Sequence, residues 1–251
     1  MKVVAIIQAR MNSARLPGKV LLPLAGKPVL KHIVDRLRNC QLITEVVVAT
    51  SNELSDVPVV EFCSSNQIDY YRGSLNDVLD RYYQAGKEIQ ADVIVRITGD
   101  CPVIDPVVVD AVIAGYLAGD YDLYGLTGEF PDGLDCTVFS FSAIEKAWND
   151  ASLKSEREHV GPSIENNPKL FKTGGLHLFH GLAAQRWTLD EPQDYELLIQ
   201  IFDELYSPSI PFYSHDILQL LGKRPELLLL NHEIIRNAGY IKSLQEDGKK
   251  L

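Results

Sequence analysis

Short apolar segments alternate with helical patterns from residue 3 to about residue 118, and this alternation constrains the fold more than any other feature. The apolar runs at Val3–Ile7, Glu45–Ser51 and Ala91–Gly99 are typical of strands buried on both faces, and Asp69–Tyr71 reads as a shorter strand. Apolar residues at helical spacing predict four helices, over residues 29–37, 57–66, 76–90 and 106–117. Such alternation predicts an α/β fold with a mostly parallel sheet.

The pattern changes after residue 118. Residues 122–142 are rich in Gly, Asp and β-forming residues, and residues 177–189 read as a strand followed by a polar turn. We therefore expect a small, more antiparallel lobe, followed by a mainly helical part whose polar end, SLQEDGKKL, frays. The prediction is one domain over 1–251, with parts at about 3–118, 119–192 and 193–251.

Composition limits the classes of partner. The 251 residues carry a formal net charge of −10, which argues against a general nucleic-acid binder. A local group of cations can still bind a small anion, because nearby charges set the field inside a cleft. No apolar run reaches the ~20 residues that span a bilayer, and Met1 leads directly into a strand. We expect a cytoplasmic protein with no membrane segment.

The cysteines follow the same expectation. Cys40, Cys63, Cys101 and Cys136 show no CxxC spacing and lie in apolar or strand-like segments. They are predicted to be reduced thiols of the core.

The loop after the first strand holds Arg10, Arg15 and Lys19 within ten residues. Open α/β sheets bind ligands at the carboxyl ends of their strands, yet neither GxGxxG nor GxxxxGK[ST] occurs here. Arginine forks grip two phosphate oxygens at once and lysine adds a point charge, so the loop suits a ligand with several phosphates. Pro17-Gly18 predicts a sharp turn before Lys19. A solvated loop with surface charges is the alternative.

A carboxylate is expected at the same edge of the sheet. Asp100 follows the strand over residues 92–97, within TGDCP. Mg²⁺ prefers oxygen ligands, commonly one or two carboxylates plus substrate phosphates. Asp100 is therefore a candidate magnesium ligand, and a plain turn-forming role is the alternative.

Several motifs together resemble one group of enzymes. The stretch QARMNSARLPGKVLLPLAGKPVL resembles the signature P-A-R-x-x-S-x-R-L-P-x-K of cytidylyltransferases that activate acidic sugars, the CMP-KDO and CMP-sialate synthetase group. Gln8 replaces the usual Pro. With RGSLNDVLDRYY, RITGDCPVIDP, PDGLDC and REHV, this indicates the branch of the spore coat polysaccharide biosynthesis protein F family. The resemblance runs from residue 3 to about 245.

The resemblance implies a fold and a reaction. The fold would be that of nucleotide-diphospho-sugar transferases, which are glycosyltransferase-A-like. The reaction would transfer CMP from CTP to an acidic or amino sugar for a surface polysaccharide, with release of pyrophosphate. Residues 3–118 would bind the nucleotide, and residues 119–192 the sugar and a second copy in a homodimer. Alternatives are a sugar-phosphate nucleotidyltransferase that uses another nucleotide, and a non-catalytic nucleotide-binding protein.

The resemblance also implies roles for residues. Arg15, Lys19 and Asp100 would be catalytic, and Asp100 and Asp190 (in LDEPQDYELL) would hold Mg²⁺. The nucleotide would be bound by Gln8, Ala9, Arg10, Arg15, Lys19, Arg72 and Arg81. Asp194 has a structural alternative, because an acid in the first turn of a helix stabilises it.

The sugar would be bound by Asp132, Asp135, Arg157 and His159. The sequence leaves open whether the two acids only form a turn and whether the histidine only packs. Arg157, or else Arg186, is the candidate partner for a sugar carboxylate. Lys27 matches a family lysine of less defined role.

Overall fold

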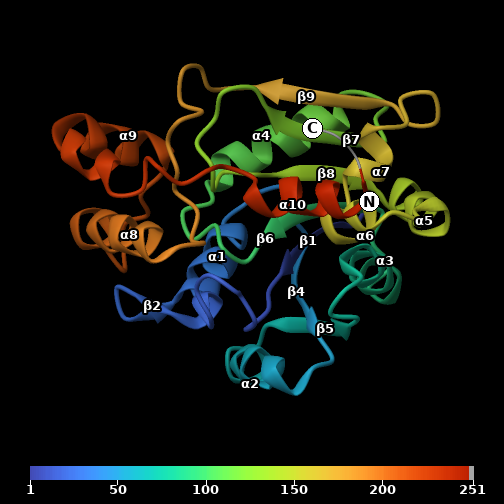
Figure 1. The fold of residues 1–251 in the computed structure, drawn as a ribbon, viewed down its shortest axis with the longest axis horizontal. Coiled ribbons are helices and arrows are strands. Elements are labelled where there is room, and N and C mark those ends of the chain that lie inside the picture. The colour runs from blue at the N-terminus through green and yellow to red at the C-terminus, as the bar shows by residue number, and fades with distance from the viewer. Residues whose placement is uncertain (249–251) are drawn as a thin grey trace.

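A seven-stranded sheet forms the centre of the protein in the computed structural model, which describes residues 1–248 (Figure 1). The strand order is β5-β4-β1-β6-β8-β7-β9. Four neighbouring strands are parallel: β5 (Asp69–Gly73), β4 (Glu45–Ser51), β1 (Val3–Gln8) and β6 (Val93–Thr98). These are the strands that the apolar runs predicted.

The other three strands extend the same sheet. β8 (Thr137–Ser140) is antiparallel to both β6 and β7 (Leu123–Thr127), and β9 (Thr173–His177) is parallel to β7. A separate antiparallel pair joins β2 (Pro23–Leu24) to β3 (Lys27–Pro28). The predicted α/β class with a mostly parallel sheet is confirmed. The strand expected within residues 177–189 was misplaced, since β9 ends at His177.

Two hydrophobic cores lie on the two faces of the sheet. Val3, Ala5 and Ile7 of β1 belong to one core, and Val4 and Ile6 belong to the other, as the alternation of side chains along a strand requires. The first core is covered by α1 (Val29–Leu37), α2 (Val57–Ser65), α4 (Pro106–Leu117), α8 (Pro192–Leu205) and α9 (Ser214–Lys223). The second is covered by α3 (Val78–Glu88), α5 (Phe141–Asp150) and α7 (Pro162–Glu165).

Shorter elements complete the chain. Three 3₁₀ turns are η1 (Lys19–Leu21), η2 (Leu54–Asp56) and η3 (Pro225–Leu229). Helix α6 (Lys154–His159) packs against α10 (Ala238–Glu246), the last described helix, which crosses in front of the sheet in Figure 1. The polar end of the chain was expected to fray, but residues 243–246 belong to α10, and residues 249–251 lie outside the described part.

The carboxyl ends of β1 and β6 approach each other closely. The Gly99 N–H donates to the Gln8 carbonyl over 2.9 Å, and a Cβ at Gly99 would lie only 2.8 Å from that oxygen. Glycine at this position therefore lets the segments after the two strands run side by side. This brings the loop after β1 next to Asp100.

The described residues also test the expectations about membrane segments and cysteines. None of the helices over residues 1–248 is long and apolar enough to cross a membrane. The four cysteines are free and buried, as predicted.

Candidate active site

The loop after β1 is fixed by a buried carboxylate. Asp56 is fully buried and accepts hydrogen bonds from the N–H groups of Met11, at 2.7 Å, and Ser51, at 3.2 Å. At the far end of the loop, Gly18 adopts a left-handed conformation with φ 73° and donates to the Met11 carbonyl at 2.8 Å. The turn predicted at Pro17-Gly18 is confirmed, and it leads directly into Lys19.

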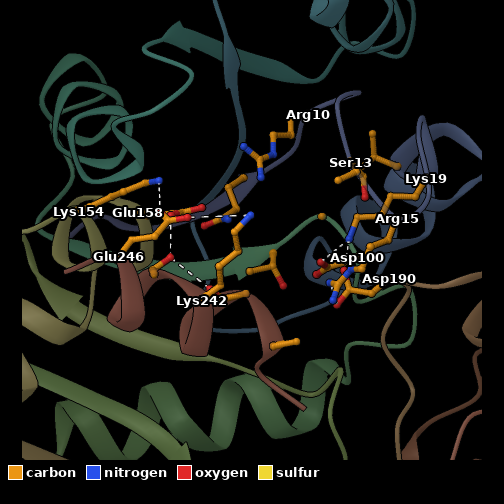
Figure 2. A pocket seen from close by; sticks show the side chains of 18 residues that line it. Arg10, Ser13, Arg15, Lys19, Asp100, Lys154, Glu158, Asp190, Lys242 and Glu246 are labelled. Atoms are coloured by element: carbon orange, nitrogen blue, oxygen red, sulfur yellow. Dashed lines mark hydrogen bonds and ion pairs between the residues drawn. The ribbon is translucent and has the colours of Figure 1, made fainter. Parts of the chain in front are cut away.

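Lys19 lies between two carboxylates. Its Nζ is 2.8 Å from Oδ2 of Asp100 and 2.6 Å from Oδ1 of Asp190, and its side chain is 11% exposed. Arg15 donates to the other oxygen of Asp190 at 2.9 Å and to Glu191 at 3.1 Å. Arg15 and Lys19 of the loop thus meet the acids of two distant motifs at one place, as Figure 2 shows, and Arg10 lies apart from them.

The pairing fixes the charges of this group. Burial disfavours the charged form of Asp100, but the Lys19 ammonium outweighs it and lowers the pKa of Asp100 to about 2. Burial likewise acts to lower the pKa of Lys19, and the two carboxylates raise it overall. At neutral pH the Lys19 ammonium therefore faces an ionised Asp100 carboxylate.

Asp100 and Asp190 present oxygen atoms to a common point, which suits a hard cation. Within residues 1–248, no group of three or more His, Cys, Asp or Glu side chains could hold a metal by itself. Mg²⁺ is usually bound by one or two carboxylates together with substrate phosphates, rather than by an all-protein cage. Two convergent carboxylates therefore fit a metal that completes its coordination with phosphate oxygens.

A buried arginine holds the segment around Asp190 in place. Arg186 forms a two-pronged contact with Asp194, from Nε at 2.8 Å and from Nη2 at 2.9 Å, and a third bond to Asp132 at 2.6 Å. Asp194 has no exposed surface and also accepts from the N–H groups of Asp190 and Glu191. Asp194 thus has the structural role considered above.

Arg186 is shared among three carboxylates, those of Asp132, Asp190 and Asp194. Burial and the neighbouring Asp135 raise the pKa of Asp132 to about 7, and Arg186 only partly offsets them. Gly133, with φ 108°, allows the turn to approach Trp187, because a Cβ there would lie 2.7 Å from the Trp187 carbonyl carbon. A fixed turn therefore holds the two acids of PDGLD opposite Asp190.

Two adjoining cavities open at this edge of the sheet. The first, here called the cationic cavity, measures about 500 Å³ and is lined by Arg10, Ser13, Arg15, Lys19, Asp100 and Asp190, among others. Figure 2 shows a second group of side chains across it, from α6 and α10: Lys154, Glu158, Lys242 and Glu246. The second cavity, of about 620 Å³, is lined by residues that include Gln8, Ala9, Arg10, Asn76 and Arg81.

Two smaller chambers lie beside the cationic cavity. The inner chamber, of about 200 Å³, is lined by residues that include Asp100, Asp132, Asp135, Asp190 and His159. The outer chamber, of about 280 Å³, shares His159 with it and adds Glu165. Arg96 and Tyr240 line both chambers.

The predicted nucleotide and metal residues are largely brought together. The exceptions are Arg72 and Lys27. Arg72 donates to the carbonyls of Ser51 and Glu53 and does not line these cavities. Lys27 lies over the Tyr206 ring, away from this edge.

Of the predicted sugar-binding residues, some line a cavity and one does not. Asp132, Asp135 and His159 line the inner chamber. Arg157 lines none of the four cavities: its guanidinium donates to the carbonyls of Trp148 and Ala151 and contacts Asp77 at 3.4 Å. Arg157 and Arg186 are therefore engaged by the protein itself, and neither is placed to meet a sugar carboxylate.

Sequence reasoning missed one wall of the site. Helix α10 contributes to all four cavities, with residues between Asn237 and Glu246. Its contacts with α6 are mainly polar: Ser243 bonds His159 at 3.1 Å and Glu158 at 2.8 Å, and Lys154 pairs with Glu246. The Tyr240 ring also packs edge-on against His159. Arg96 was also missed; it lies inside β6, four residues before Asp100.

Cations and paired carboxylates at the carboxyl ends of a mostly parallel sheet define the architecture of a nucleotidyltransferase. A family model described as "Cytidylyltransferase" matches residues 4–215. This chain therefore belongs to the cytidylyltransferase family and is an enzyme of that kind, as the resemblance implied. Helix α10 lies beyond the matched residues.

Similar proteins agree with this family. The spore coat polysaccharide biosynthesis protein SpsF of Bacillus subtilis is 30% identical over 229 residues, which cover 88% of this chain and 94% of that protein. The 3-deoxy-manno-octulosonate cytidylyltransferase of Geobacter metallireducens is 36% identical over 118 residues, covering 47% of this chain and 46% of that protein. The solved structure of a cytidylyltransferase from Leptospira borgpetersenii is 33% identical and has a TM-score of 0.87, covering 94% of this chain and all of that one.

Proposed function

We propose that the protein transfers CMP from CTP to a sugar of the acidic or amino kind and releases pyrophosphate, for the synthesis of a surface polysaccharide. The observation that carries this proposal is Lys19, held between Asp100 and Asp190 at the edge of a cavity lined by Arg10 and Arg15. The names of the SpsF and 3-deoxy-manno-octulosonate relatives support the sugar and the polysaccharide.

The chemistry follows from the charges of the cationic cavity. A sugar hydroxyl attacks the α-phosphorus of CTP; the new P–O bond forms as the bond to the β-phosphate oxygen breaks, and the hydroxyl proton passes to water. Negative charge grows on the departing pyrophosphate and on the non-bridging oxygens. Positioning and fixed charges do most of the work in such transfers, and Arg10, Arg15 and Lys19 supply those charges here.

We propose Mg²⁺ as the cofactor, held by Asp100 and Asp190 together with the phosphates of CTP. When bound, it supplies positive charge to the phosphate oxygens. The contribution of the chain is to hold both carboxylates aimed at one point. Lys19 does this from one side, and Arg15 and Arg186 hold Asp190 from the other.

The nucleoside would lie in the second cavity. Arg81 is 2% exposed, and its guanidinium donates to the Leu75 carbonyl at 3.0 Å and to that of Ser74. Its neighbour Asp80 instead accepts from Trp148, at 2.9 Å. Of this adjacent pair, Arg81 is therefore the residue that shapes the cavity. The expected homodimer and cytoplasmic location stay predictions.

Calorimetric titration of CTP, UTP, ATP and GTP, with and without Mg²⁺, tests the proposal. We expect CTP to bind most tightly, Mg²⁺ to strengthen binding, and Asp100→Asn to remove that strengthening. Asp150→Asn, a change at an exposed position of α5, is the matched control. Preference for another nucleotide would move the function to a different sugar-activating transferase, and no nucleotide binding would contradict the proposal.

A further inference from the structure

Arg96 is placed in the wall of the two chambers by its strand. It lies on β6, paired with Ile6 of β1 on one side and with Thr137 of β8 on the other. Val95 and Ile97, its neighbours in the strand, point into the opposite hydrophobic core. Arg96 therefore faces the side of the sheet on which α6 and α10 pack, and it lines both chambers.

In the described part of the chain, the guanidinium of Arg96 makes no ion pair and no hydrogen bond; Glu165 is near enough for Arg96 to act on its pKa. Across residues 1–248, no carboxylate lies within ion-pair distance of it and no group accepts a hydrogen bond from it; its Nε is shielded from solvent. Buried donors are almost always satisfied, because an unmade hydrogen bond to a buried charged group is costly. An unsatisfied, buried Nε–H in the wall of a cavity therefore indicates a ligand that accepts from this guanidinium.

The other cations near the chambers are already engaged. Arg186 is shared by three aspartates, and Arg15 pairs with Asp190 and Glu191. Arg236 donates to the Phe130 carbonyl at 2.8 Å and lies 3.5 Å from Asp135. Among the described residues that line the two chambers, Arg96 is thus the cation left for an incoming anion.

The surroundings limit the charge that such an anion can carry. Glu165 lines the outer chamber with Arg96, and Asp132 and Asp135 line the inner one. His159 adds no fixed charge, because burial lowers its pKa, with Arg96 acting in the same direction. One guanidinium among several acids matches the single charge of a carboxylate better than the double charge of a phosphate.

We propose that Arg96 is the residue that selects the acceptor, by binding the carboxylate of an acidic sugar through both prongs of its guanidinium. Tyr240 of α10 lines the chambers above it, and the inner chamber leads to Asp100 and Asp190. A carboxylate held on Arg96 orients the sugar so that its hydroxyl faces the α-phosphate. This inference rests on the proposed transfer of CMP. It adds that the acceptor is an acidic sugar and that Arg96 is the residue that recognises it.

The test compares Arg96→Gln and Arg96→Lys with the wild type in a pyrophosphate-release assay with CTP and Mg²⁺. The acceptors are several 2-keto sugar acids, 3-deoxy-manno-octulosonate among them, with mannose as a neutral sugar and mannose 1-phosphate as a phosphate source. Arg38→Gln is the matched control, since Arg38 is exposed and bonds only the Gln67 carbonyl in the described structure. CTP binding is measured in parallel by calorimetry.

We expect turnover with a sugar acid and not with mannose. Arg96→Gln should raise KM for that acid about 10- to 100-fold, the scale of a lost charged hydrogen bond, with CTP affinity unchanged. Arg96→Lys should recover part of the loss, because lysine keeps the charge but not the fork.

Three results would overturn the inference alone, provided that the wild type binds CTP. They are an unchanged KM in Arg96→Gln, preference for mannose 1-phosphate or mannose, and no turnover of any sugar acid. Failure of the wild type to bind CTP would instead contradict the proposed function itself.

Discussion

Lys19 performs two tasks at the scale of a single residue. Its ammonium keeps Asp100 ionised although burial opposes that charge, by lowering the pKa of the Asp100 carboxyl; it also bonds Asp190 and lies at the edge of the cationic cavity. Two carboxylates at this spacing without a cation would repel each other, and the pKa of one would rise. The same contact thus stabilises the ligand-free protein and holds the oxygen atoms that would bind the proposed metal.

Replacing Asp100 tests its catalytic role. Asp100→Asn should lower kcat by on the order of 10²-fold or more, because one preorganised charged group is lost, and Lys19→Ala should do the same. Turnover is measured by pyrophosphate release, with Asp150→Asn as control. Wild-type turnover in either variant would contradict the assignment.

Removing the lysine should change how stability depends on pH. The pKa of Asp100 is about 2 in the folded protein, against an ordinary value of 3.8. The ionised form is therefore favoured by folding, and this stabilisation is complete above pH 3.8 and disappears as the pH falls through about 2. Lys19→Met leaves the carboxylates unneutralised and should reduce the free energy of unfolding at pH 7 by about 1–3 kcal/mol.

The difference between the wild type and Lys19→Met should then shrink as the pH falls from about 4 toward 2. Urea unfolding at several pH values measures it. A difference that stays constant over this range would show that Asp100 does not titrate as described, and that Lys19 contributes only through packing.

Helix α10 is the element that joins the cavities. It buries little of itself, since only Ser243 among its residues is buried, and polar contacts with α6 hold it. Segments with few buried apolar contacts contribute little to global stability. The helix therefore closes the site without supporting the fold.

Deleting residues 237–251 should separate these two properties. We expect circular dichroism and the unfolding midpoint to stay close to the wild type. We expect kcat/KM to fall by about 10-fold or more, because the wall that positions both substrates is lost. Ser243→Ala should give a smaller loss, and Ser142→Ala, at an exposed position, none. Unchanged kinetics in the deletion would exclude α10 from the site.

The elements differ in how well the sequence predicts them. β1, β4 and α1 were predicted almost to the residue, because continuous apolar runs and helical spacing are strong signals. Helix α3 begins two residues later than expected, since Asp77 caps it by accepting from the Asp80 N–H. β9 was missed: its sequence TGGLH has two glycines and no β-branched residue after Thr173, and its pairing with β7 is visible only in three dimensions.

The same difference between local and long-range signals decides which site residues the sequence predicts. Lys19, Asp100 and Asp190 were predicted because each lies in a recognisable motif at the end of a strand or beside one. Arg96 was not, because an arginine inside a strand gives no sign of whether it finds a partner. The role of α10 depends on long-range packing, which its polar sequence does not encode locally.

The whole molecule has a negative net charge but contains one local group of positively charged side chains. The chain carries a formal charge of −10, yet three cations gather in the loop after β1.

The four cysteines are all buried, and burial raises the pKa of the Cys63 thiol to about 12. The thiolate, which is the reactive form, is therefore scarce.

Thiol chemistry should accordingly report on global folding. In native protein, a thiol-specific reagent should modify fewer than about one cysteine per chain within minutes, and all four after unfolding in guanidinium chloride. Reducing agents should leave the unfolding midpoint unchanged, because the described structure has no disulfide among these four free thiols. Rapid reaction of a native thiol would show that the first core, which contains all four cysteines, opens.

The loose attachment of α10 has a consequence for protein engineering. The residues that hold the sheet together and the residues that close the site occupy separate stretches of sequence, and the closing stretch lies outside the matched family segment. Residues 237–246 can therefore be exchanged as a cassette, and a library of such exchanges should contain mostly folded proteins. New acceptor preferences can be sought there without rebuilding the scaffold.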